Sequence, residues 1–373
     1  MEEKSKVYFT DFRARPGYNL LQKLEKLVKK AGIENIDFEN KYVAIKIHFG
    51  EPGNLAYLRP NYSKVIVDLV KKLGGKPFLT DCNTLYVGGR KNALDHLDSA
   101  YINGYNPFTT GCHIIIADGL KGTDEQYVEI NQEYVKTAKI GRAIMDADVI
   151  ISMNHFKGHE GTGFGGAIKN IGMGCGSRAG KMEMHSSGKP NVIPEHCKKC
   201  KQCIKICAHG AISYNEEGKA VIDHNKCVGC GRCIGICNFD AIKSPNDEAA
   251  DILNKKMAEY ALAVVKDKPQ FHISLICDVS PNCDCHGEND APIVPNIGML
   301  ASFDMVALDK ACADLVNKQE IFENSYLAEQ MKNGVKEKDL FHCNHPDTNW
   351  ESQIEHGEKI GLGTKEYELI EIK

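Results

Sequence analysis

The chain has 373 residues, of which 42% are hydrophobic and 26% charged, with a formal net charge of −4. This composition is typical of a soluble globular protein; it excludes a fibrous or disordered chain and is too balanced for a whole-chain nucleic-acid binder. No apolar run approaches the roughly 18 residues of a membrane helix, and the start, MEEKSKVYFTDF, has charges where a secretory signal has its apolar segment. Sixteen cysteines in a chain expected in the cytoplasm indicate metal or redox chemistry rather than disulfides.

The first 155 residues alternate short apolar runs with amphipathic stretches. The apolar runs predict buried strands, and the stretches with apolar residues three and four apart predict helices. The predicted strands are 7–9, 42–48, 77–81, 114–118 and 149–153, and the predicted helices are 20–28, 62–73 and 90–103. This alternation predicts an α/β fold, with a mixed or parallel sheet and helices on both faces. Polar residues such as His48 and Asp81 end several strands, where open α/β sheets bind their ligands.

The pattern changes twice further along the chain. Residues 158–188 are rich in glycine and show no regular spacing of apolar residues, and residues 190–245 are rich in cysteine. The α/β pattern then resumes, with predicted helices at 248–265, 307–316 and 320–332 and predicted strands at 271–276 and 367–372. We therefore predict one α/β domain, formed by 1–189 and 246–373, that is interrupted by a small α+β insert at 190–245.

The cysteine-rich segment contains two copies of the pattern C-x2-C-x2-C-x3-C. Three thiolates on one tight loop hold three irons of a cubane, and in duplicated modules the fourth cysteine of each run serves the other cluster. This spacing predicts two [4Fe–4S] clusters, the first held by Cys197, Cys200, Cys203 and Cys237 and the second by Cys227, Cys230, Cys233 and Cys207. The alternatives are zinc and disulfides, but zinc sites use two well-separated pairs without the third cysteine.

This segment resembles the bacterial-type two-[4Fe–4S] ferredoxin domain. It departs from that pattern where Ala208 and Asn238 replace the proline that usually follows the fourth cysteine. Residues 195–245 contain eight basic and five acidic side chains. This excess predicts a docking patch for an acidic electron carrier such as a ferredoxin or a flavodoxin, and the alternative is an ordinary solvated lysine face.

The glycine-rich segment contains the candidate catalytic and cofactor-binding residues. Its glycines formally match G-x-G-x-x-G, but they lie too far from the preceding strand for a dinucleotide turn. A loop that approaches an anionic ligand closely, or one that is merely flexible, explains them better. The candidate cofactor-binding residues are Gly163, Gly165, Gly166 and Lys181, and the candidate catalytic residues are His155, Lys157, His159 and Lys169. His155 and His159 could also form a metal-binding pair, although Gly158 between them opposes a helix.

A second group of cysteines follows the predicted strand 271–276. Cys283, Cys285 and His286 offer thiolates and an imidazole, which suit zinc or a further iron site. The alternative is a turn with reduced thiols, as is ordinary in a cytosolic protein.

Several motifs resemble the uncharacterised iron–sulfur-centre protein family called "domain of unknown function 362". The resemblance extends over nearly the whole chain and is carried by HFKGHEGTGFGGAIKNIGMGCGSRAGK, TDCNTLYVGGR, CDVSPNCDC and IGMLASFDMVALDKACADLV. It implies an α/β domain that carries a ferredoxin module. The positions it marks as distinctive are His48, Asp81, Asn83, Lys157, His159, Lys169, Asn170, Lys181, Cys283, Cys285, Asp304 and Asp309.

Together these patterns predict a cytoplasmic redox protein without nucleic-acid or membrane partners. Two clusters would relay low-potential electrons to a cleft at the carboxyl edge of the sheet, where a small anionic substrate or cofactor is reduced. His155 or His159 would supply a proton, while Lys157 and Lys169 would hold negative charge. The alternatives are a pure electron carrier or maturation scaffold, and a metal-dependent non-redox enzyme with structural clusters.

Overall fold

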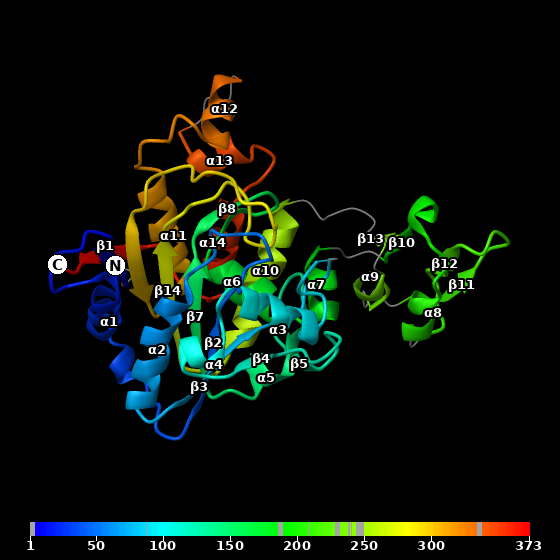
Figure 1. The fold of residues 1–373 in the computed structure, drawn as a ribbon, viewed down its shortest axis with the longest axis horizontal. Coiled ribbons are helices and arrows are strands. Elements are labelled where there is room, and N and C mark those ends of the chain that lie inside the picture. The colour runs from blue at the N-terminus through cyan, green and yellow to red at the C-terminus, as the bar shows by residue number, and fades with distance from the viewer. Residues whose placement is uncertain are drawn as a thin grey trace.

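Figure 1 presents the computed structural model, which describes residues 4–373 except 87, 186–188, 208, 228–231, 238, 240, 244–249 and 334–337. An eight-stranded sheet lies at its centre. In spatial order the strands are β16 (Tyr367–Glu371), β1 (Ser5–Asp11), β15 (Gly298–Ser302), β14 (Gln270–Ile276), β7 (Val149–His155), β2 (Tyr42–Lys46), β3 (Lys76–Asp81) and β4 (Ile114–Ile116). Neighbouring strands are parallel except at β15, which is antiparallel to both β1 and β14. The predicted mixed α/β sheet is therefore confirmed.

Helices cover both faces of this sheet, so its central strand β7 is buried along its whole length. Successive side chains of a strand point to opposite faces. Val149 and Ile151 accordingly pack in one hydrophobic core, and Ile150 packs in the other. The first core is covered by α1 (Leu20–Lys30), η1 (Ile33–Asn35), α2 (Pro60–Lys72) and α3 (Ala93–Ile102). The second is covered by α5 (Arg142–Met145), α6 (Ala167–Cys175), α10 (Ala250–Val265), α11 (Met305–Val316), α12 (Tyr326–Lys332), α13 (Leu340–Asn344) and α14 (Glu351–Lys359).

The remaining elements are short. They are α4 (Pro107–Thr110), α7 (Arg178–His185) and the antiparallel pairs β5 (Glu125–Glu129) with β6 (Thr137–Gly141) and β8 (Lys157–His159) with β9 (Gly163–Gly165). Among the described residues, no helix combines the length and the apolar character needed to span a bilayer.

The cysteine-rich segment forms its own small elements. They are β10 (Asn191–Val192), η2 (Pro194–His196), α8 (Gln202–Ile206), β11 (Ile212–Tyr214), β12 (Ala220–Ile222), α9 (Arg232–Ile236) and β13 (Ile242–Lys243). These elements lie to one side of the sheet, far from the two chain termini (Figure 1). Strand β10 pairs with β13, which brings the start of the segment next to its end, as an insertion requires. The domain boundaries at 189/190 and 245/246 stay a prediction.

Two parts of the sheet domain differ from the prediction. The glycine-rich stretch, expected as a loop, folds into the β8–β9 hairpin and helices α6 and α7. Helix α6 persists despite its glycines because it packs tightly against α10: a Cβ on Gly172 would lie 2.1 Å from the carbonyl oxygen of Met257. Strand β15 was not predicted, since its five residues, GMLAS, are all buried and lack alternation.

Candidate functional site

A cavity of about 680 Å³ lies where β2, β3 and β7 end. Parallel strands place their carboxyl ends at one edge, and the polar side chains that follow them meet there. The predicted residues on its wall are His48, Asp81, His155, Lys157, His159, Gly165, Gly166, Lys169, Lys181, Cys285 and His286. Cys283 is buried behind this wall. The expectation of one shared cleft is thus met by residues that are far apart in sequence.

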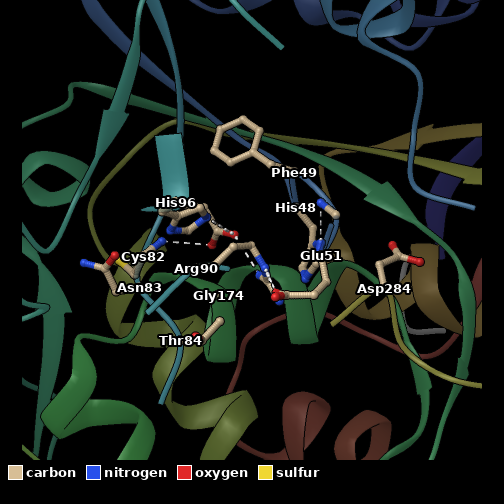
Figure 2. Close-up of polar contacts among 12 residues, drawn as sticks. His48, Phe49, Glu51, Cys82, Asn83, Thr84, Arg90, His96, Gly174 and Asp284 are labelled. Carbon is tan, nitrogen blue, oxygen red and sulfur yellow. Dashed lines mark hydrogen bonds and ion pairs between the residues drawn. The ribbon is translucent and has the colours of Figure 1, made fainter. Parts of the chain in front are cut away.

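A chain of buried ion pairs forms one wall of the cavity. Lys46 Nζ lies 3.0 Å from Asp81 Oδ1, and Arg90 Nε lies 2.8 Å from Glu51 Oε2. Figure 2 shows Arg90 reaching Glu51, with His96 on the far side of the network. Burial opposes the charge of Asp81, but Lys46 and His96 outweigh it and hold the pKa of this carboxyl well below its usual range. Sequence reasoning missed Lys46, Glu51 and Arg90; a lysine inside the apolar run YVAIKIHF was the available signal.

His48 lines the cavity with a neutral imidazole ring that can donate a hydrogen bond. Its Nδ1 accepts a hydrogen bond of 3.0 Å from the backbone N–H of Gly50. Burial and the nearby Arg90 guanidinium lower the pKa of His48 well below its usual value. The neutral ring therefore carries its proton on Nε2.

The candidate glycines make room for neighbouring side chains, and Gly165 and Gly166 also lie on the cavity wall. A Cβ on Gly163 would lie 2.7 Å from Cβ of Trp350, and one on Gly166 would lie 2.3 Å from Oδ1 of Asp309. Gly165 leaves room for the stems of Lys157 and Lys169, each 3.3 Å from where its Cβ would be. None of these contacts requires a cofactor. The proposed cofactor-binding role of these glycines therefore gains no support from their surroundings.

Lys181 lies on the cavity wall beside the end of α6. Its Nζ donates to the carbonyl oxygens of Gly176, at 2.6 Å, and Gly174, at 3.4 Å. A lysine at this place satisfies carbonyls at the carboxyl end of the helix. Among the described residues, no carboxylate forms an ion pair with Lys181 or Lys169, so the ammonium groups of these two lysines are not neutralised by a direct carboxylate partner.

His155 and Lys157 line the cavity and also hold a buried carboxylate behind its wall. His155 Nδ1 lies 2.9 Å from Asp284 Oδ1, its Nε2 lies 2.8 Å from the Cys277 carbonyl oxygen, and Lys157 Nζ lies 3.4 Å from Asp284 Oδ2. Both nitrogens of His155 are engaged, which corrects its prediction as a proton donor or metal ligand. The two side chains fix Asp284, whose pKa they hold well below its usual range despite its burial.

Asp284 lies between Cys283 and Cys285 in the sequence. These two cysteines lie close to the other predicted site residues, His159, Lys169 and His286. One ligand atom from each of His159, Cys283 and Cys285 lies within 4.8 Å of the others, and so does one from each of Glu160, Cys285 and His286. Lys169 Nζ lies 3.5 Å from Sγ of Cys283. The contact with Cys285, the charge of Lys169 and the contact with His159 lower the pKa of Cys283 well below its usual value although burial opposes this. These residues are candidates for metal binding or thiol chemistry.

A second, smaller cavity lies within the cysteine-rich segment. Its wall includes Cys197, Cys200, Cys203 and Cys237, the four residues predicted to share the first cluster. The backbone N–H groups of Ala220 and Ala241 point at the sulfurs of Cys197 and Cys237, at 3.5 and 3.4 Å. The predicted second set is described only in part, because Cys230 lies outside the described residues.

The loop after β3 has residues at both cavities. Leu85 lies on the wall of the large cavity and also packs in the hydrophobic cluster around Cys197 and Cys237. Lys91 Nζ donates a hydrogen bond of 2.6 Å to the carbonyl oxygen of Cys237. Lys91 directly follows Arg90 of the ion-pair wall. One short loop therefore touches both sites.

A family model described as "Domain of unknown function (DUF362)" matches residues 43–314, which is more than half of the chain. The chain belongs to this family. It is similar to a structural-genomics protein from Thermotoga maritima, at 12% identity over 79% of this chain and 57% of that chain, with a TM-score of 0.40. It is also similar to the lactate racemase apoprotein from Thermoanaerobacterium thermosaccharolyticum, at 13% identity over 100% of this chain and 84% of that chain, with a TM-score of 0.41. The chain thus spans 57% of the length of the Thermotoga protein, and no curated protein matches it.

Other positions marked by the sequence resemblance, Asn83, Asp304 and Asp309, make structural contacts. Asp309 accepts hydrogen bonds from the backbone N–H groups of Ala167 and Ile168 and so caps α6. Asp304 caps α11, and Asn83 Nδ2 donates to buried Asp118 at 2.8 Å. Asp304 and Asp309 are therefore structural residues that position helices.

Proposed function

We propose that this DUF362 protein is a cytoplasmic iron–sulfur redox protein that reduces a small anionic substrate or cofactor in the large cavity. Two [4Fe–4S] clusters, when bound, would supply single electrons at low potential. The observation that carries the proposal is the double role of Leu85, which packs against the cysteines of the insert and also lines the cavity. A pure electron carrier has no use for a cavity of about 680 Å³.

The cysteines of the insert fit the first cluster. All four predicted ligands border one small cavity, and backbone N–H groups point at two of the sulfurs, as thiolate ligands favour. Lys199 and Lys201, in the loop between these cysteines, have φ angles of 58° and 64°. This left-handed backbone is costly for a side chain other than glycine and is found where a site imposes its geometry.

The side chains of the large cavity would bind and orient the substrate. Lys169 and Lys181 attract negative charge, and the N–H of neutral His48 can donate a hydrogen bond. The basic excess of the insert would attract the acidic electron carrier, a ferredoxin or a flavodoxin, by long-range steering.

Iron analysis of the anaerobically purified chain tests the cluster assignment. We expect about eight irons and eight sulfides per chain. Cys207→Ser should lose about half of the iron, because Cys207 is assigned to only one of the two clusters. Cys112→Ser, which changes a buried cysteine of the sheet domain, should retain all of it. A chain that carries two zinc ions and no iron would overturn the proposal.

A redox titration with a panel of small carboxylates and phosphates then tests the substrate class. The reduced protein should be reoxidised only by a compound that enters the cavity, and Lys169→Met should slow this reoxidation more than it slows reoxidation by ferricyanide, which can take electrons at the surface. Equal effects on both reactions would count against a substrate site in the cavity.

A further inference from the structure

The turn from Cys283 to His286 places two thiols side by side, with Cys285 on the cavity wall and Cys283 buried directly behind it. The backbone N–H of His286 closes the turn on the carbonyl oxygen of Cys283 at 3.1 Å. The sulfurs of Cys283 and Cys285 lie within 4.8 Å of each other, and both cysteines are free. Thiols held this close by a turn need only a small movement to join as a disulfide.

Several contacts fix this turn to the sheet domain. Asp284 is held by His155 and Lys157 on one side, and its carbonyl oxygen accepts a hydrogen bond of 3.0 Å from the backbone N–H of Glu51. The side chain of Asn54 donates to the carbonyl oxygen of His286, also at 3.0 Å. The turn therefore holds Cys285 at a defined place on the cavity wall, with Cys283 behind it.

The surroundings give the two thiols different properties. The Lys169 ammonium lies 3.5 Å from Cys283 Sγ, and no carboxylate among the described residues pairs with this lysine. A cation at this distance favours the thiolate of Cys283, the nucleophilic form of a cysteine. Cys285 is open to the cavity, where a substrate can reach it, and the Cys283 thiolate beside it can take its proton.

A metal ion suits the same group less well. Nδ1 of His159 accepts hydrogen bonds from the backbone N–H groups of Gly161, at 3.0 Å, and Thr162, at 3.1 Å. A neutral ring in this state carries its proton on Nε2, so neither nitrogen offers a lone pair to a metal. The ammonium of Lys169 would also repel a divalent cation bound at Cys283.

We propose that Cys283 and Cys285 are a redox-active dithiol that reduces a disulfide carried by a small anionic molecule in the cavity. The inference names the substrate class of the proposed function and rests on it for its source of electrons. Lys169 and Lys181 would receive the negative charge of this molecule.

The exchange balances as two successive displacements. Cys285 passes its proton to the neighbouring Cys283 thiolate, attacks one sulfur of the substrate disulfide, forms a mixed disulfide and releases the first substrate thiolate. Cys283 then gives this proton to the departing thiolate and attacks Sγ of Cys285, which releases the second substrate thiolate and leaves a Cys283–Cys285 disulfide. Two electrons and one proton, with the electrons from a low-potential one-electron donor, restore the Cys283 thiolate and the Cys285 thiol.

Peptide-resolved mass spectrometry of the anaerobic, cluster-loaded protein tests the dithiol directly. The protein is equilibrated with glutathione and its disulfide, quenched with acid, and alkylated. We expect a bond between Cys283 and Cys285 under oxidising ratios and two alkylated thiols under reducing ratios, while buried Cys277 stays a thiol throughout. Cys283→Ser should accumulate a glutathionyl adduct on Cys285, whereas Cys285→Ser should form an adduct on buried Cys283 far more slowly.

Alkylation rates test the part played by Lys169. Lys169→Met should slow the reaction of the Cys283–Cys285 pair with iodoacetamide about tenfold, because the thiolate of the pair loses its charged partner. The exposed-lysine variant Lys136→Met should leave the rate unchanged. Exchange with glutathione disulfide, which is anionic, should also be faster than exchange with cystamine, which is cationic, and Lys169→Met should reduce that preference.

A second arm uses reduced methyl viologen, which donates single electrons, in place of glutathione. It should reduce the Cys283–Cys285 disulfide faster in the wild type than in Cys237→Ser. If glutathione exchange shows the Cys283–Cys285 disulfide but methyl viologen reduces it equally fast in both proteins, the dithiol assignment is supported and the proposed electron relay is wrong. If zinc is bound and both cysteines resist oxidation and alkylation until it is removed, the group is a metal site and the inference is wrong. It is also wrong if oxidation never joins the two sulfurs.

Discussion

The ion pairs of buried Asp284 with His155 and Lys157 form a clamp behind the cysteine turn. Replacing Asp284 with asparagine tests whether this clamp holds the turn in place. The side chain of Asp284 is fully buried, and the side chains that meet its carboxylate, His155 and Lys157, are also buried. Asparagine keeps the shape of the side chain and removes its charge. Removing one partner of a buried ion pair costs about 3–5 kcal/mol, because the remaining charge stays buried without compensation. We therefore expect Asp284→Asn to lower the free energy of unfolding by about this amount at pH 7.

Urea denaturation followed by far-ultraviolet circular dichroism under anaerobic conditions measures this loss. The control is Asp37→Asn, which removes a solvent-exposed i,i+4 partner of Lys41 and should change stability by less than about 0.5 kcal/mol. The pKa of Asp284 is lower in the folded than in the unfolded chain, so its contribution is present above about pH 4 and is lost as the pH falls toward the folded value. A loss below about 1 kcal/mol at pH 7, or one that persists unchanged at low pH, would refute the clamp.

Two further predictions concern packing and buried charge. Gly172→Ala should destabilise the fold by about 1–3 kcal/mol, because the new Cβ meets the Met257 carbonyl oxygen; Gly161→Ala, whose nearest neighbour would lie at 3.6 Å, should cost less than about 0.5 kcal/mol in the same urea assay. Burial raises the pKa of Asp118 to about 7, so the folded chain holds this proton more tightly than the unfolded chain. The stability of the wild type relative to Asp118→Asn should therefore fall as the pH rises from about 4 through about 7, and a relative stability that rises over this range would contradict the assignment.

Much of the central sheet follows from the sequence alone. The runs at 42–48, 77–81, 149–153 and 271–276 become β2, β3, β7 and β14, because short, largely apolar runs suit strands covered on both faces. The strand-end rule then placed His48 and Asp81 at one cavity, since side chains at the carboxyl ends of parallel strands share an edge. The cysteine spacing likewise predicted that Cys237 lies beside the run that starts at Cys197, and the two border the same small cavity.

The roles of the polar residues depend on contacts that no local pattern encodes. His155 and Lys157 follow a strand as substrate-facing residues do, yet the turn between Cys283 and Cys285 folds back and gives them a buried carboxylate. The glycines near α6 resemble a cofactor loop, but Asp309 and Trp350, more than 140 residues later, occupy the space beside them. Local sequence determines which segments form strands and which residues can do chemistry; only the packing of distant segments decides whether such a residue faces the cavity or a partner within the protein.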